Sequence, residues 1–120
     1  MKPLEKRKFP RRSCSVPAII YRKGQTTSGQ VLNISEEGLA LEVKKTLDMD
    51  EKITIEFLPP LSAELVSVQG VVRHVSSVTQ SSRKKGRENF FWVGVWMIQP
   101  SLTLQQTIRR FIKSPLVEAL

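Results

Sequence analysis

Hydrophobic and polar residues alternate along most of this chain, which is the pattern of β-strands that bury one face. Turn signals such as Lys23-Gly24 and Pro59-Pro60 separate the alternating segments. The strands predicted from this pattern are 15–22, 28–34, 40–43, 52–57, 65–75 and 90–98. Strands of this number and near-regular spacing favour an antiparallel barrel or sandwich, because closure of the sheet removes exposed edges.

The last segment changes to a helical period. Its apolar positions fall at i, i+4, i+7 and i+8, and they are Leu104, Ile108, Phe111 and Ile112. Thr103 and Gln106 have the spacing of a capping box, and Pro115 predicts the end of the helix. We expect this amphipathic helix to cover an open end or side of the barrel; docking of a partner is the alternative role for its apolar stripe.

A chain of 120 residues is long enough for one domain with a cooperative core. Residues 1–13 are basic and broken by prolines, and they predict a flexible N-terminal segment. The barrel and helix are expected over residues 14–113, followed by a short tail at 114–120. The fold class is therefore mainly β.

The formal charge of +8 is concentrated in two places. Residues 1–12 and the predicted loop 83–87 hold 10 of the 19 lysines and arginines. This clustering favours an anionic partner, although many basic runs are simply solvated.

Catalytic and metal-binding signatures are not evident. His74 is the only histidine and is interpreted as structural, and the turn residues Glu36 and Glu37 are interpreted as solvated. Cys14 is the only cysteine, which excludes an intrachain disulfide and favours a reducing compartment. No segment approaches the roughly 18 apolar residues of a membrane-spanning helix. We expect a cytoplasmic protein that is not an enzyme and needs no cofactor or metal.

Two short motifs carry candidate binding chemistry. Arg7 and Arg11 offer permanently charged planar forks that match phosphate oxygens or the O6/N7 edge of guanine. Asn33 and Ser35 alternate with Ile34 on a predicted strand, so the polar pair faces outward if Ile34 faces inward. Gly38 follows at a turn, where a positive φ or a close approach would require glycine. An ordinary hairpin is the structural alternative for this second motif.

A platform is expected on the last strand. Trp92, Gly94 and Trp96 share one face, and two indoles flanking a bare glycine can support a purine, since base stacking contributes roughly 1–3 kcal/mol per base. The alternative is that the tryptophans pack beneath the N-terminal segment or the helix.

The order and spacing of the two motifs, with Asn33 22 positions after Arg11, resembles the PilZ domain family, whose members bind the bacterial second messenger cyclic di-GMP. The resemblance runs over residues 5–113 and implies a six-stranded antiparallel PilZ-like β-barrel with a C-terminal α-helix. It also implies that a glycine and a stacking aromatic on the last strand lie near the ligand, which maps to Gly94 and Trp92.

The resemblance implies a receptor that passes second-messenger level to a downstream protein partner. Arg7 and Arg11 would grip phosphates and guanine, with Arg12 as a third clamp. Asn33 would read guanine or support an arginine, Ser35 would donate to phosphate or base, and Gly38 would admit the ligand to the backbone. Ligand stoichiometry stays open. The rival readings are a small basic barrel that binds nucleic acid and a ligand-free family member that acts as a protein-interaction adaptor.

Overall fold

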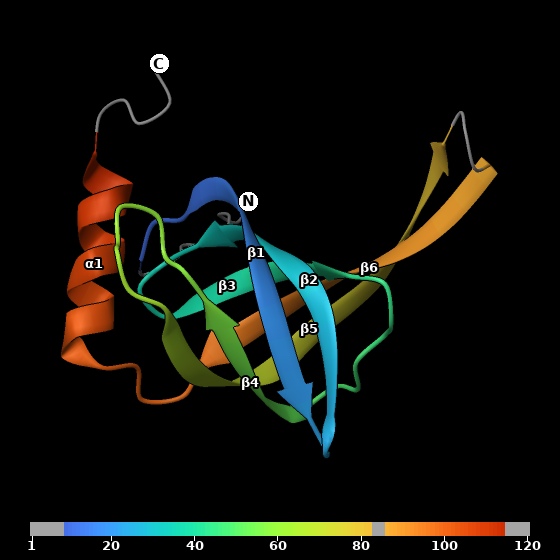
Figure 1. The fold of residues 1–120 in the computed structure, drawn as a ribbon, viewed down its shortest axis with the longest axis horizontal. Coiled ribbons are helices and arrows are strands. Elements are labelled where there is room, and N and C mark those ends of the chain that lie inside the picture. The colour runs from blue at the N-terminus through green and yellow to red at the C-terminus, as the bar shows by residue number, and fades with distance from the viewer. Residues whose placement is uncertain (1–8, 83–85, 115–120) are drawn as a thin grey trace, which may run out of the picture.

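Six antiparallel strands close into a barrel, and one helix lies across one end of it (Figure 1). The computed structural model describes residues 9–82 and 86–114, with side chains left out at 79–82 and 86–88. The elements are β1 (Arg12–Arg22), β2 (Gln25–Ile34), β3 (Gly38–Val43), β4 (Lys52–Phe57), β5 (Val66–Ser82), β6 (Gly86–Met97) and α1 (Leu102–Lys113). The barrel and helix expected from the sequence are confirmed.

The strands follow the order β1-β2-β3-β6-β5-β4 around the barrel, and β4 pairs with β1 to close it. Each neighbouring pair is antiparallel. Inward side chains such as Ile20, Val31, Leu41 and Ile55 are fully buried. Burial of one such side chain is worth about 1.5–3 kcal/mol, so the alternating pattern drives closure of the sheet.

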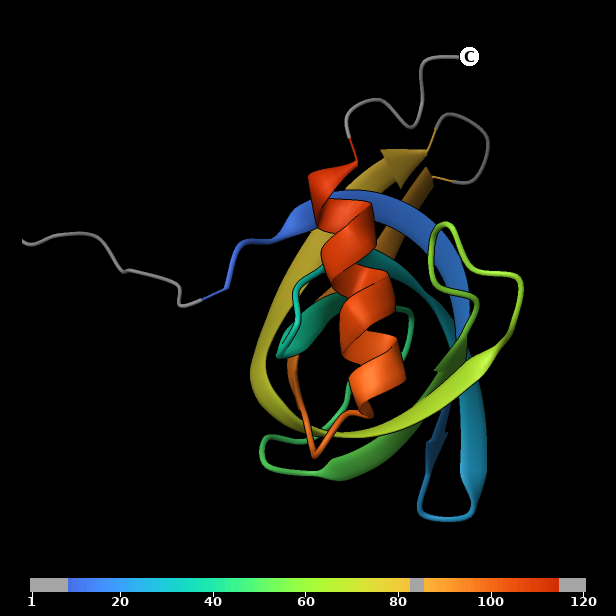
Figure 2. The same ribbon diagram turned by 90° about the vertical axis from the view of Figure 1, so that its left-hand side faces the viewer.

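Helix α1 crosses the open end of the barrel, as Figure 2 shows. Leu104, Ile108 and Phe111 are buried in the same core as the strands, which confirms the expected role of the apolar stripe. The predicted cap was wrong. Ser101 is the N-cap: its backbone is extended, and its Oγ accepts a hydrogen bond of 3.0 Å from the Leu104 amide. Thr103 therefore lies within the first turn.

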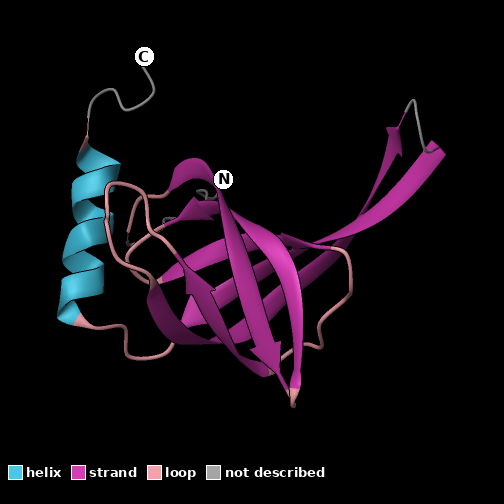
Figure 3. Cartoon of the chain, in the orientation of Figure 1, coloured by secondary structure: helices cyan, strands magenta, loops and turns pink. Residues whose placement is uncertain are grey.

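The β5–β6 ribbon continues beyond the predicted strands and projects from the barrel (Figure 3). Pairing reaches Ser82 and Gly86, and the cationic Arg87, expected in a loop, lies within β6. Residues 83–85 lie outside the described residues. The extension was missed because residues 76–82 and 86–89 are mostly polar, so alternation of polar and apolar residues is weak there.

The remaining strand boundaries shift by a few residues. β1 begins at Arg12, so the barrel starts before the expected boundary at residue 14, and Arg12 is part of the sheet. Within the described ranges, no helix has the length and apolar character needed to cross a bilayer.

Candidate functional site

The two predicted motifs meet at the start of β1. Ser13 pairs with Asn33 across the β1–β2 ladder, which brings Arg11 beside the same residue. The guanidinium Nη1 of Arg11 donates a hydrogen bond of 3.0 Å to Oδ1 of Asn33, although the residues are 22 positions apart. Arg7, the other arginine of the motif, lies outside the described residues, and its role stays a prediction.

Arg12 faces a different element from Arg11. Its Nη1 donates to the backbone oxygens of Phe111, at 2.7 Å, and Ser114. Its Cζ also lies 4.7 Å from the centroid of the Phe111 ring. The last carbonyls of a helix lack partners within the helix and carry partial negative charge, so an arginine is favourable there. In this structure Arg12 anchors the C-terminal end of α1.

The hydroxyl of Ser35 is used inside its own turn. Ser35 is only 1% exposed, and its Oγ accepts hydrogen bonds of 3.2 Å from the amides of Glu37 and Gly38. The same Oγ donates to the Gly38 carbonyl at 3.3 Å. Ser35 therefore fixes the β2–β3 turn, and its contact with a ligand stays a prediction.

Glycine at position 38 is required by a close approach and not by a left-handed backbone. A Cβ placed there would lie 2.5 Å from the carbonyl oxygen of Val95. The approaching group is the β6 backbone, which pairs with β3 through Gly38 and Trp96. Gly38 thus lets the turn sit tightly against β6.

Glu36 is not solvated, so that interpretation was wrong. Arg109 of α1 donates to both of its carboxylate oxygens, at 2.7 and 3.0 Å, and the Glu36 side chain is 10% exposed. These hydrogen bonds lower the pKa of Glu36. The sequence gave no signal for the pair, because the residues are 73 positions apart and belong to different kinds of element.

Four residues form one row across the outer face of the sheet. Asn33 pairs with Ala40, Ala40 pairs with Gly94, and Gly94 pairs with His74. Ala40 and Gly94, the two smallest residue types, therefore make a floor between the polar side chains of Asn33 and His74. The floor is covered: Ala40 is fully buried, and the Trp92 ring lies against Gly94.

The tryptophans border this floor on the outer face, as the strand alternation predicted. Trp92 is partly buried, with its ring 5.7 Å from that of His74 in an edge-on arrangement. Trp96 is 55% exposed, and the guanidinium of Arg73 lies 4.8 Å from its centroid. The neighbouring Val93 and Val95 point into the core. Trp92, Gly94 and Trp96 therefore share the outer face of β6, and their use as a stacking platform stays a prediction.

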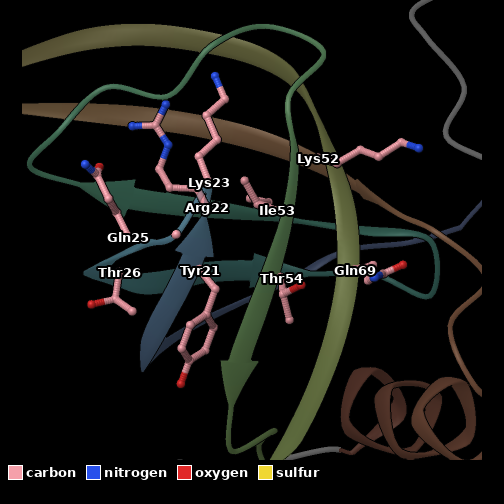
Figure 4. Close-up of a pocket in the computed structure, with 10 residues that line it drawn as sticks. Tyr21, Arg22, Lys23, Gln25, Thr26, Lys52, Ile53, Thr54 and Gln69 are labelled. Atoms are coloured by element: carbon pink, nitrogen blue, oxygen red, sulfur yellow. The ribbon is translucent and has the colours of Figure 1, made fainter.

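One hollow of the described surface, of about 540 Å³, lies beside the N-terminal motif and is lined by Arg12, Ser13 and Phe111. Figure 4 shows another, of about 510 Å³, at the β1–β2 turn, bordered by Arg22, Lys23 and Lys52. Arg22 donates to both carboxylate oxygens of Glu51 at 2.7 and 2.8 Å, and Lys23 lies 3.5 Å from Asp48. These ion pairs neutralise much of the charge in that hollow, so it offers little to an anion.

Reactive groups are not assembled into a site in the described part of the chain. Cys14 is partly buried, and burial raises the pKa of its thiol to about 11, so the thiol is protonated at neutral pH. No group of His, Cys, Asp and Glu side chains in the described ranges could hold a metal ion.

Solved structures with this fold are known. The PilZ domain of YcgR from Escherichia coli, solved with c-di-GMP, matches with a TM-score of 0.72 and 13% identity over 90% of this chain and 89% of that one. The MrkH–c-di-GMP complex of K. pneumonia matches with a TM-score of 0.67 and 20% identity over 91% and 52%. MotI of Bacillus subtilis, an inhibitor of motility, matches with a TM-score of 0.67 and 17% identity over 97% and 56%.

The chain spans about half the length of MrkH and MotI. At these identities the structural matches establish the fold. No curated protein matches the chain. The family model of the PilZ domain matches residues 5–114, which includes both motifs, the barrel and α1. The chain therefore belongs to the PilZ domain family.

Proposed function

We propose that this chain is a receptor domain for cyclic di-GMP and not an enzyme. The observation that carries the proposal is the hydrogen bond between Arg11 and Asn33. It joins the arginine motif to the asparagine motif on an outward surface of the barrel, beside a floor of Ala40 and Gly94. Such a surface combines a guanidinium and an amide, which are groups suited to a guanine nucleotide.

In this proposal Arg11 is oriented before the ligand arrives. Its guanidinium donates to Asn33, and the planar fork of an arginine matches a phosphate oxygen or the O6 and N7 atoms of guanine. Arg7, four positions earlier, would supply a second fork. Asn33 would hold Arg11 in place or read the guanine edge with its amide.

Stacking and turn geometry would complete the site. Trp92, whose ring lies against Gly94, would support a base by stacking. Gly38 and Ser35 would act mainly by fixing the turn after Asn33, since Gly38 packs against Val95 and the Ser35 hydroxyl is bonded within the turn.

We further propose that binding orders the N-terminal arginine segment and that this change reports occupancy to a protein partner. Two residues beside the site are already attached to α1: Arg12, next to Arg11, and Glu36, next to Ser35. Movement of either motif would therefore be passed to the helix and to the surface around it. Ordering the segment costs about 1–2 kcal/mol per residue, which contacts with phosphates and bases must offset.

Isothermal titration calorimetry with cyclic di-GMP tests the proposal, using the wild type, Arg11→Ala and the control Lys52→Ala. Arg11→Ala should bind at least tenfold more weakly, because a charge-assisted hydrogen bond contributes roughly 1.5–3 kcal/mol. Lys52→Ala removes an exposed charge on β4 and should bind like the wild type. Tighter binding of a short DNA duplex than of the dinucleotide would instead favour the nucleic-acid reading. A wild type that binds neither would favour the adaptor.

A further inference from the structure

A β-bulge in β5 presents two consecutive side chains on the outer face. Val72 pairs with Val95 and His74 pairs with Gly94, so Arg73 is an extra residue between two ladder positions of β6. Val72 is fully buried, whereas Arg73 and His74 are both exposed. A regular strand would have sent one of these two side chains inward; the bulge aims both outward.

Each of these side chains lies against a tryptophan of β6. The Cζ atom of Arg73 is 4.8 Å from the Trp96 centroid, and the His74 ring is 5.7 Å from the Trp92 ring at an interplanar angle of 76°. Gly94 lies between the two tryptophans along β6. The cation–π contact favours one position of the long Arg73 side chain, so its guanidinium is held near the platform before any ligand binds.

The bulge and Arg11 lie at opposite ends of the row of paired residues that contains Ala40 and Gly94. Asn33, on β2, and His74, on β5, end the row that contains Ala40 and Gly94. Neighbouring strands are about 4.8 Å apart, so three steps across the sheet separate the ends of the row by roughly 14 Å. Arg11 reaches this floor from the β1–β2 side, and Arg73 is presented from the β5 side.

We propose that Arg73 is a further binding residue for the cyclic dinucleotide, making a bidentate contact with a phosphate or a guanine edge from the β5 side. The proposal rests on the proposed function. Its chemistry is that of Arg11, but Arg73 comes from a paired strand and is supported by an indole. The ligand would then lie on the outer face of the sheet between two guanidinium groups.

Calorimetry with cyclic di-GMP on Arg73→Ala, Arg73→Lys and Arg110→Ala tests the inference. Arg110 is the matched control because it is an exposed arginine on α1, so its removal changes the net charge equally. Arg73→Ala should weaken binding at least tenfold, and Arg110→Ala should stay within about twofold of the wild type. Arg73→Lys should recover only part of the loss, since an ammonium cannot make a bidentate contact. Thermal unfolding should be nearly unchanged in all three.

The inference is overturned if Arg73→Ala binds within about twofold of a wild type that does bind, if Arg73→Lys binds like the wild type, or if Arg110→Ala loses as much affinity as Arg73→Ala. In the first two cases the proposed function stands and only the role of Arg73 falls. A wild type that does not bind cyclic di-GMP overturns both.

Discussion

Arg109 donates two hydrogen bonds, of 2.7 and 3.0 Å, to the carboxylate of Glu36, and so ties helix α1 to the turn that follows Asn33. Arg12 makes the second attachment, through the carbonyls at the C-terminal end of the helix. Both attachments begin one residue from a candidate ligand-binding residue. The helix that closes the barrel is therefore linked to the two motifs by polar contacts as well as by its apolar face.

Neighbouring arginines should have separable roles. Arg12→Ala removes the hydrogen bonds to α1 and the contact with Phe111, so the free energy of unfolding should fall by about 1–3 kcal/mol. Urea denaturation measures this loss. The matched variant Arg11→Ala should lose less stability and more ligand affinity. Equal stability losses in the two variants would show that Arg12 is not a special anchor of the helix.

The ion pair between Glu36 and Arg109 should make stability depend on acid pH. The pKa of Glu36 is lowered in the folded state, so the pair stabilises the protein above the unfolded pKa of about 4.3, and this contribution is lost as the pH falls through the folded pKa. Urea denaturation at about pH 6 and about pH 3 should show a smaller difference in Glu36→Gln than in the wild type. The pKa of Glu51 is also lowered in the folded state, but this contribution to the pH dependence is the same in both proteins and cancels in the comparison. The same difference in both would contradict a stabilising role for the pair.

Two glycine substitutions should separate folding from binding. Gly38→Ala places a Cβ 2.5 Å from the Val95 oxygen and should destabilise the barrel by about 1–3 kcal/mol or more. Gly94→Ala places a Cβ 3.3 Å from the His74 Cβ, a tight contact that a small shift can relieve. Its thermal unfolding should change less, while its affinity for cyclic di-GMP should fall because the added methyl group lies against the Trp92 ring, 3.9 Å from Cζ3, and restricts its position. An unchanged affinity in Gly94→Ala would show that the floor is not part of the binding site.

Limited trypsin digestion tests whether the ligand orders the N-terminal segment. If cyclic di-GMP is held by Arg7 and Arg11, cleavage after the basic residues of this segment should slow at saturating ligand: Lys6, Arg7, Lys8, Arg11 and Arg12. Cleavage within the exposed Lys44-Lys45 pair should be unaffected and serves as the internal control. Equal cleavage rates with and without bound ligand would show that this segment does not clamp the ligand.

The strands of the barrel could be predicted because burial of one face imposes alternation, and α1 could be predicted because its apolar residues share a helical face. The β5–β6 extension could not, since residues 76–82 and 86–89 are mostly polar and lack this alternation. From the motifs, Asn33 was expected either to read guanine or to support an arginine, and the structure shows it bonded to Arg11. The attachments of Arg12 and Glu36 to α1 could not be predicted either. Their sequence separations are 99 and 73 positions, and neither local propensity nor periodicity carries information on such distant pairs. The bulge at Arg73 is likewise a property of strand pairing.

Selectivity between cyclic di-GMP and cyclic di-AMP tests the central claim most directly. Both ligands have the same charge and ring, but adenine presents an N6 donor where guanine presents the O6 acceptor. An arginine fork such as that of Arg11 can donate to both O6 and N7 of guanine, whereas adenine offers it only N7 as an acceptor. Calorimetry on the wild type should therefore show binding of cyclic di-GMP at least tenfold tighter than that of cyclic di-AMP. Equal affinities, or no binding of cyclic di-GMP, would contradict the account.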